Sequence, residues 1–277
     1  MSAYIRAETK TVKVNGLAFA YRELGPRQGV PVVFLHHLTA GLDDWDPSIV
    51  DGIAESRHVV AFDNRGVGRS EGQTPEDVQA MAHDAEAFID AMGLKKVDLF
   101  GYSLGGFIAQ VIATERPTLV RKIILAGTGP AGGLGIAKIG DVLQTAMQRS
   151  AAESKHPKTL LFFTPSVSSQ KSAGEFLTRL NQRSADKDAA VTNETIQAQA
   201  VAITKWGASP ANDLKSITHP VLVVNGDDDT MFPTVNSFEL YEKLPNATLS
   251  IFPDASHGGI FQYHGEFVRQ AVRFLDS

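Results

Sequence analysis

Apolar residues gather along the chain in short runs that are separated by polar and glycine-rich segments. Two such runs, Val12–Val14 and Leu17–Tyr21, flank the dipeptide Asn15-Gly16. Asn-Gly accepts positive φ at both central positions of a tight turn, and it is typical of two-residue connections between antiparallel strands. The amino-terminal pattern therefore predicts a β-hairpin.

Further runs are continuously apolar and rich in β-branched residues: Val30–Leu35, His58–Phe62, Val97–Phe100, Ile123–Ala126, Val221–Val224 and Thr248–Phe252. Continuous rather than alternating hydrophobicity is typical of strands that are covered on both faces. Helical patterns lie between them, at Leu104–Glu115, Pro233–Leu244 and Gly259–Leu275. Another helix is expected to have Thr74 as its N-cap and Pro75 in its first turn, and to end at Gly93. This alternation predicts an α/β fold with helices on both faces of a largely parallel sheet.

One long stretch, from about Ala131 to Asn212, breaks the alternation. It carries helical patterns near Ile136–Arg149, Ala173–Arg183 and Thr192–Trp206, with an aromatic-rich run at 160–163 between them. An insertion of this size in a sheet protein needs a role of its own. We expect a helical cap at 131–212 between two parts of a core, 1–130 and 213–277. The alternative is that these helices pack on the flank of the sheet.

Charge and composition exclude several classes of function. The chain has 26 Lys and Arg against 31 Asp and Glu, a net charge of -5, so neither nucleic acid nor an anionic membrane is an expected partner. It has no cysteine, which excludes disulfides, thiolate metal sites and a cysteine nucleophile. The amino-terminal residues do not resemble a signal peptide, and no apolar run reaches the ~20 residues of a membrane span. A cytoplasmic protein is expected, and the sequence predicts no oligomeric state.

The strongest local signal is the segment Gly101–Gly105, which reads G-x-S-x-G around Ser103 and joins a predicted strand directly to a predicted helix. A serine on such a turn presents its hydroxyl at the carboxyl edge of the sheet, and the next backbone N–H is free to bind an oxyanion. The pattern is short enough to occur by chance, and a small-residue turn that packs on the sheet is the alternative. The strand–turn–helix context favours a nucleophile.

A nucleophilic serine needs a histidine base and a carboxylate that orients it, and both follow in the chain order that this turn requires. Three carboxylates, Asp227, Asp228 and Asp229, follow a buried strand, and His257 lies on a loop of small residues after the last strand. Each alone has an ordinary alternative, a solvated turn or an inert loop histidine. The remaining histidines precede strands or prolines or lie in helices: His58, His83, His156, His219 and His264.

Two patterns that resemble other binding sites are weaker. The pair His36-His37 leaves a central strand, but adjacent strand residues point in opposite directions, so it makes a poor metal site. The run Gly127–Gly132 matches G-x-G-x-x-G, yet Pro130 removes a donor, and no strand ending in an acidic residue follows at the distance a dinucleotide fold needs. We therefore expect no cofactor and no metal.

Taken in order, these motifs resemble the α/β-hydrolase superfamily from about Lys13 to Leu275. The resemblance rests on Leu35-His36-His37, Asp63–Ser70 (D-x-R-G-x-G-x-S), Gly101–Gly105, Gly226-x-x-Asp229-x-x-x-Pro233 and Ser256-His257-Gly258. It implies a mostly parallel eight-stranded sheet with a cap. It also implies Ser103 as nucleophile, His257 as general base and then acid, and Asp229 as the carboxylate that orients His257.

The same resemblance assigns the oxyanion hole to the backbone N–H groups of Leu104 and Leu38. His37 departs from the family pattern, because most relatives have glycine there, so the role of Leu38 is less secure than that of Leu104. We expect side chains of the first loops and of the cap to line the substrate pocket: His37, Tyr102, Phe162, Phe163 and Trp206.

The serine at position 103 also reduces the number of candidate reactions. Haloalkane dehalogenases and epoxide hydrolases resemble this chain but use aspartate there. The expected reaction is hydrolysis of a small carboxylic ester or lactone through an acyl-serine intermediate. Cofactor-free perhydrolases of the non-haem haloperoxidase kind, carbon–carbon bond hydrolases and small peptidases remain as alternatives. A receptor of hydrolase fold with little turnover is the non-enzymatic alternative.

Overall fold

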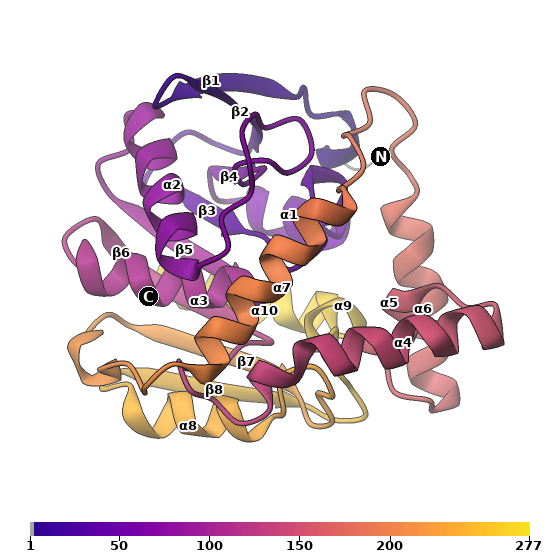
Figure 1. The fold of residues 1–277 in the computed structure, drawn as a ribbon. Coiled ribbons are helices and arrows are strands. Elements are labelled where there is room, and N and C mark those ends of the chain that lie inside the picture. Colours follow the sequence, from indigo (N-terminus) through magenta and orange to yellow (C-terminus); the bar gives the residue numbers. More distant parts are fainter. Residues whose placement is uncertain (1–2) are drawn as a thin grey trace.

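The computed structural model describes residues 3–277; Met1 and Ser2, which begin the stretch that does not resemble a signal peptide, lie outside the described residues. An eight-stranded sheet runs through the centre of the molecule (Figure 1). Its strands are β1 Lys10–Val14, β2 Leu17–Leu24, β3 Val32–Leu35, β4 Val59–Phe62, β5 Val97–Tyr102, β6 Val120–Ala126, β7 Val221–Gly226 and β8 Ala247–Phe252. They lie in the order β1-β2-β4-β3-β5-β6-β7-β8.

Strand β2 runs antiparallel to both of its neighbours, and the pairs from β4 to β8 are parallel. This arrangement confirms the predicted mostly parallel eight-stranded sheet. The register places Leu35 of β3 beside Gly101 of β5, and Ala126 of β6 between Tyr102 of β5 and Val224 of β7. The carboxyl ends of the four central strands therefore meet at one edge.

The amino-terminal hairpin forms where the apolar pattern predicts it. Asn15 and Gly16 have φ values of 50° and 88°, and the turn they make pairs Val14 with Leu17. Positive φ at both central residues gives the turn a twist that matches the flanking strands. The hairpin thus follows from the dipeptide itself.

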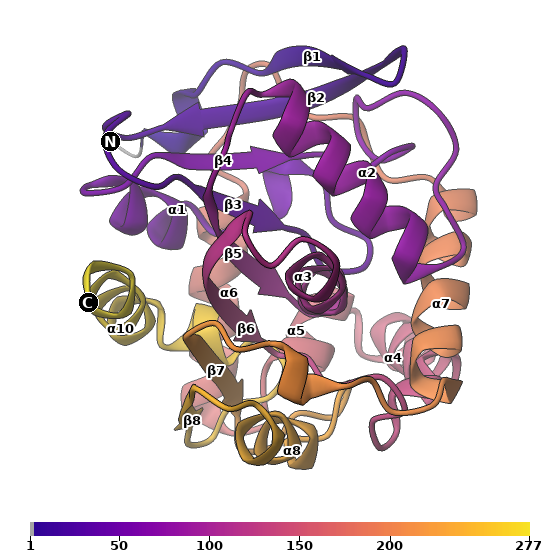
Figure 2. The same cartoon turned by 90° about the vertical axis from the view of Figure 1, so that its left-hand side faces the viewer.

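Helices cover both faces of the sheet. The α-helices are α1 Pro47–Ala54, α2 Val78–Ala91, α3 Leu104–Glu115, α4 Ile139–Glu153, α5 Pro157–Phe162, α6 Val167–Leu180, α7 Asn193–Ala208, α8 Val235–Lys243, α9 Gly259–Gln262 and α10 His264–Asp276. Helices α1 and α10 pack together on one face, and α2 and α3 pack together on the other (Figure 2). Strands β3, β4 and β5 are buried along their whole length, as their continuous hydrophobicity predicts.

The start of α2 was predicted wrongly. Its N-cap is Asp77, whose carboxylate accepts a hydrogen bond from the Ala80 N–H at 2.7 Å. The Thr74 hydroxyl instead donates to the carbonyls of Arg65 and Gly66, at 3.1 and 3.2 Å. Thr74 therefore holds the preceding loop, and the acidic residue nearest the apolar pattern caps the helix.

The predicted helix Gly259–Leu275 is divided in two. Tyr263, at φ -107°, separates α9 from α10. The helical periodicity on the two sides of Tyr263 read as continuous in the sequence, because a single residue outside the helical region changes the pattern very little.

Residues 131–212 contain helices α4 to α7, which lie between β6 and β7 in the chain. Figure 1 shows α4, α5 and α6 grouped at one side of the sheet. Three ion pairs tie this segment to the loop after β3: Lys158 to Asp44, Arg183 to Asp43, and Arg179 to the fully buried Asp46, the last with an Nη2–Oδ2 distance of 2.7 Å. None of the helices in residues 3–277 combines the length and apolar character that crossing a membrane requires.

Two helices of this segment differ from the sequence pattern. Helix α6 begins at Val167 rather than near Ala173, because Ser166 caps it by accepting from the Ser169 N–H at 3.1 Å. The aromatic-rich run at 160–163 lies partly in α5, which starts at Pro157. The first turn of α6 is polar, so the apolar pattern did not mark where α6 begins. Helix α5 is too short to give a recognisable helical pattern.

A pair of carboxyl groups also joins the inserted segment to the core. Asp63 follows β4, and both Asp63 and Asp188 accept from the Leu42 N–H, at 2.9 and 3.0 Å. Burial raises the pKa of Asp63 well above its usual range, and the neighbouring Asp188 carboxylate raises it further. Asp63 therefore holds a proton in the folded protein at pH values where the unfolded chain has lost it.

This proton makes stability depend on pH. The contribution of Asp63 to the free energy of unfolding is fully present below its pKa in the unfolded chain, about 3.9. It is lost as pH rises through the pKa of Asp63 in the folded protein. Across that window the free energy of unfolding should fall by up to about 1.4 kcal/mol per pH unit. Asp63→Asn lacks the titrating group. The free energy of unfolding of this variant, measured in urea between pH 5 and 8, should therefore rise relative to that of the parent as pH increases. Asp188→Asn should also flatten the dependence. Parallel curves for parent and Asp63→Asn would show that Asp63 is ionised.

Candidate active site

The turn between β5 and α3 holds Ser103 in a strained backbone conformation. Its φ is 57° and its ψ is -119°, a region that non-glycine residues rarely adopt. The turn is fixed by hydrogen bonds from the Ser103 N–H to the Ala126 carbonyl, and to the Ser103 carbonyl from the Gly106 N–H and the Thr128 hydroxyl, each 2.9 Å long. The Ser103 hydroxyl is buried and has no hydrogen-bond partner among residues 3–277.

Close backbone contacts explain the two glycines of the motif. A Cβ at Gly105 would lie 2.0 Å from the Leu35 carbonyl oxygen, and one at Gly101 would lie 2.4 Å from that of Gly105. Both separations are far inside van der Waals contact. Glycine at these positions therefore lets α3 begin directly against the end of β3.

His257 and Asp229 meet at the same edge of the sheet. His257 Nδ1 lies 2.8 Å from Asp229 Oδ2, and the other carboxylate oxygen accepts from the N–H groups of Met231 and Phe232, at 2.8 and 3.0 Å. Because an ionised carboxylate can only accept, this bond places the proton on Nδ1 and leaves Nε2 as an acceptor. His257 Nε2 is buried and has no partner within residues 3–277. It is therefore poised to take a proton.

The neighbouring carboxylates lie elsewhere. Asp227 and Asp228 are exposed, whereas Asp229 is buried. Asp227 accepts a hydrogen bond from the Ala255 N–H at 3.1 Å and so holds the loop that carries His257. Of the three carboxylates, Asp229 is the one that contacts His257.

A cavity of about 510 Å³ contains both Ser103 and His257. Leu38 and two of the expected pocket residues, His37 and Phe162, line it as well. Leu104 is the first residue of α3, where backbone N–H groups have no acceptor within the helix. The expected nucleophile and base and Leu38 thus line one cavity, and Leu104 directly follows the expected nucleophile in the chain.

Three expected pocket residues do not line this cavity. Tyr102 packs beside His257, at 5.2 Å between ring centroids, and its hydroxyl donates to the His257 carbonyl. Phe163 packs on Phe176, and Trp206 stacks on Phe107 of α3 at 5.1 Å. Through these contacts Tyr102 anchors the loop of His257, and Phe163 and Trp206 anchor the inserted segment.

The cavity also has lining residues that the sequence pattern did not reveal. Its polar ones are Thr39, Asp44, His156, Lys158 and Asn193, and its apolar ones are Leu143, Ala146, Met147, Pro157, Leu161, Ile196 and Met231. Asp44 and Lys158 form an ion pair across 114 residues of sequence. No local signal marks such a contact. His156 was set aside because it precedes a proline, and it does cap α5, but it also reaches the cavity.

Burial and the ion pair set the charges around the cavity. Burial lowers the pKa of His37 well below its ordinary value, and the Lys158 ammonium lowers it further. Burial also lowers the pKa of His36, to about 4. For Asp44, burial acts to raise the pKa, but the Lys158 ammonium together with the Gly41 N–H and other neighbours outweighs it, so the pKa is lowered and the carboxyl stays ionised. The wall of the cavity therefore contains the neutral imidazole of His37 and the ion pair between Asp44 and Lys158.

The run Gly127–Gly132, which matches a dinucleotide motif, has a structural role here. Gly127 has a φ of 51°, and a Cβ there would lie 3.0 Å from the Tyr102 ring and 3.2 Å from the His257 carbonyl oxygen. The glycine lets β6 end close against the loop of His257. The next α-helix begins at Ile139, so no helix N-terminus follows the run directly.

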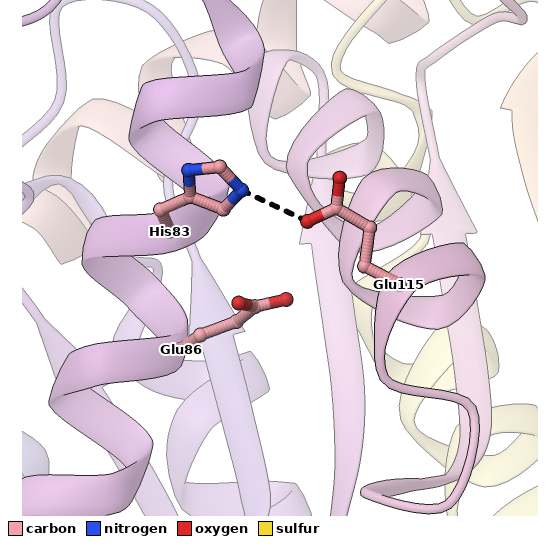
Figure 3. Close-up of side chains that lie close together, drawn as sticks. All are labelled: His83, Glu86 and Glu115. Carbon is pink, nitrogen blue, oxygen red and sulfur yellow. Dashed lines mark hydrogen bonds and ion pairs between the residues drawn. The ribbon is translucent and has the colours of Figure 1, made fainter.

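One cluster of metal-ligating side chains occurs among residues 3–277: His83, Glu86 and Glu115, whose ligand atoms lie within 4.8 Å of one another (Figure 3). His83 Nε2 and Glu115 Oε2 are 2.9 Å apart, and the two side chains are 56% and 34% exposed. Glu115 ends α3, whereas Ser103 immediately precedes that helix, so its length of roughly 18 Å separates the two places. The cluster is not part of the cavity.

Comparison with known proteins gives the sequence relatives. Residues 30–262 match the family described as alpha/beta hydrolase fold. Among characterised relatives, a non-heme chloroperoxidase of Streptomyces lividans is 28% identical over 264 residues, which cover 88% of this chain and 91% of the relative.

Solved structures agree with this match. An alpha/beta hydrolase fold protein from Chitinophaga pinensis is 42% identical, with a TM-score of 0.95 and 99% of both chains covered. The enol-lactonase from Burkholderia xenovorans is 19% identical, with a TM-score of 0.76 and coverage of 97% of this chain and 100% of the other. At that identity the likeness concerns the fold.

Proposed function

The chain belongs to the α/β-hydrolase family and is a hydrolase, and from this premise we propose that it cleaves a small carboxylic ester or lactone through an acyl-serine intermediate. The observation that carries the proposal is the hydrogen bond between His257 and Asp229, together with two buried polar atoms that have no partner among residues 3–277. His257 Nδ1 is held by Asp229 at 2.8 Å, while His257 Nε2 and the Ser103 hydroxyl are buried and unpartnered in residues 3–277. Both line one cavity.

The chemistry follows from these positions. His257 Nε2 takes the proton of Ser103 as Oγ attacks the ester carbonyl, and Asp229 stabilises the imidazolium that forms. The N–H groups of Leu104 and Leu38 bind the oxyanion of the tetrahedral intermediate. His257 then protonates the leaving alkoxide, which leaves an ester between Ser103 and the acyl group. Water, activated by His257, hydrolyses that ester and restores the serine.

Relatives support two versions of this activity. The first is hydrolysis of an ester or of a lactone, in which one molecule carries both acyl and leaving groups; an enol-lactonase shares this fold. The 28% identity to a non-heme chloroperoxidase makes perhydrolysis the second candidate, with hydrogen peroxide replacing water on the acyl-serine. Turnover of acetate with peroxide, compared with ester hydrolysis by the same preparation, separates them.

Loss of the serine hydroxyl tests covalent catalysis. Ser103→Ala should lose about 10³-fold or more in kcat, because binding and the oxyanion N–H groups remain but the nucleophile does not. A fluorophosphonate should label the parent on Ser103, as measured by peptide mass spectrometry, and leave the variant unlabelled. A folded variant with parental turnover would reject the serine mechanism, and a parent with no turnover on any ester, lactone or peroxide would favour a receptor.

The carboxylate provides a matched comparison. Asp229→Asn should reduce kcat/KM by about 10³-fold or more, because an amide at this position favours the imidazole tautomer that cannot accept the serine proton. Asp228→Asn is the control, since its side chain is exposed and does not contact His257; it should stay within a fewfold of the parent. Equal and mild effects of the two substitutions would require a different carboxylate.

We propose that residues 131–212 act as a cap that determines which substrates fit. Supporting this, the apolar residues of the cavity come mainly from α4, α5 and α7, whereas Ser103 and His257 come from the loops of the sheet. Apolar walls are the usual source of ligand burial in such pockets. The substrate would then lie between the two parts of the chain.

A pair of leucines tests the role of the cap. Leu143 on α4 lines the cavity, whereas Leu134 is 67% exposed and does not. Leu143→Ala should raise kcat/KM for long acyl esters relative to acetate esters by about tenfold, because it enlarges an apolar wall. Leu134→Ala should keep the parental chain-length profile. An unchanged profile in a folded Leu143→Ala variant would place the specificity in the loops of the sheet instead.

A further inference from the structure

His37 is a buried side chain of the cavity that takes no part in the proposed catalytic steps. It follows β3 by two residues, its residue exposure is 3%, and it lines the cavity that contains Ser103. Its ring lies edge-on to Tyr102 and to Phe162, with centroid distances of 5.2 and 5.5 Å. These two edge-on contacts fix the orientation of the buried imidazole in the wall of the cavity.

One hydrogen bond determines which nitrogen carries the proton. His37 Nδ1 lies 2.6 Å from the carbonyl oxygen of Leu38. A carbonyl oxygen can only accept, so Nδ1 is the donor and, in the neutral ring, Nε2 is an acceptor. The ring is neutral near pH 7, because burial and the nearby Lys158 ammonium lower its pKa and outweigh the opposing effect of Asp44.

The acceptor nitrogen of His37, Nε2, forms no hydrogen bond with the described part of the protein. His37 Nε2 is buried and has no hydrogen-bond partner among residues 3–277. A buried polar atom is normally paired, so an unpaired acceptor in the wall of a binding cavity is available to a ligand that brings a donor. The next residue is Leu38, whose N–H is assigned to the oxyanion hole. The imidazole therefore lies one peptide unit from the group that holds the substrate carbonyl.

We propose that His37 is a specificity-determining residue that accepts a hydrogen bond from a hydroxyl or amide N–H carried by the substrate next to its ester or lactone carbonyl. This inference rests on the proposed hydrolase function and narrows its substrate to 2-hydroxy or 2-acylamino esters and lactones. A site built to hydrogen-bond a substrate donor discriminates strongly against analogues that lack it, because its own buried group is then left unpaired.

Matched substrates test the proposal with the parent enzyme alone. We would measure kcat/KM for methyl 2-hydroxybutyrate, methyl 2-methoxybutyrate and methyl butyrate, and for 2-acetamido-γ-butyrolactone against its 2-propyl analogue. Each value is divided by the rate of hydroxide-catalysed hydrolysis, because a 2-hydroxyl activates the ester itself. The donor-bearing compounds should be preferred at least tenfold. The methoxy compound should behave like methyl butyrate, since it keeps the oxygen but cannot donate.

Two variants locate the preference. In His37→Phe a ring remains but the acceptor is lost, so the donor preference should fall to about one. In His37→Gln the side-chain amide oxygen can accept at a similar reach, so part of the preference should return. A parent without preference, or a preference that survives in His37→Phe, would overturn the inference. The parental substrate series decides the matter even if His37→Phe does not fold.

The failure of this inference differs from the failure of the proposed function. If the parent hydrolyses donor-bearing and donor-free esters at equal corrected rates, the hydrolase mechanism stands and the role of His37 is wrong. If the parent hydrolyses none of the esters and lactones, the proposed function fails, and the inference fails with it.

Discussion

The close approach of two backbones at the centre of the sheet is the constraint on which the site depends. Helix α3 begins so near β3 that the Leu35 carbonyl occupies the space of a side chain at Gly105. This contact forces the turn from β5 into α3 to be tight. Ser103, which forms that turn, takes a positive φ as a result. Hydrogen bonds to the end of β6 then offset the strain. The serine hydroxyl is therefore presented by the packing of the core.

The same principle brings the histidine and the carboxylate together. A side chain at Gly226, the last residue of β7, would lie 2.1 Å from the Ala255 carbonyl oxygen, so the loops after β7 and β8 pass in direct contact. Asp229 and His257 are each a few residues beyond this crossing. Their separation is thus set by backbone packing between two parallel neighbours, and the hydrogen bond between them orients a ring that is already in place.

Sequence patterns predicted the parts of this protein that depend on local or repeated signals. Continuous apolar runs gave the strands, and Asn15-Gly16 gave the hairpin, because strand burial and turn type are readable from neighbouring residues. The position of Trp206 could not be read in this way. Aromatic residues in the inserted segment suit either a pocket wall or an anchor on the core, and Trp206 stacks on Phe107 because that surface of α3 is apolar. The pairing of Lys158 with Asp44 was equally hidden, since it joins distant segments.

The cavity walls differ in origin, and this difference has consequences for how specificity could change. His37 and Asp44 belong to the loop after β3, which is tied to the core by the buried Asp63 and by Asp46, the N-cap of α1, so their positions depend on the folding of the sheet. The apolar wall comes from helices that are amphipathic and partly exposed, and substitutions there disturb little of the core. Under the proposed role of the cap, the accepted chain length of the substrate would therefore change with few substitutions in these helices. His37 is held by the same loop backbone as Leu38, so under the proposed function a change at His37 would alter the cavity beside the proposed oxyanion hole.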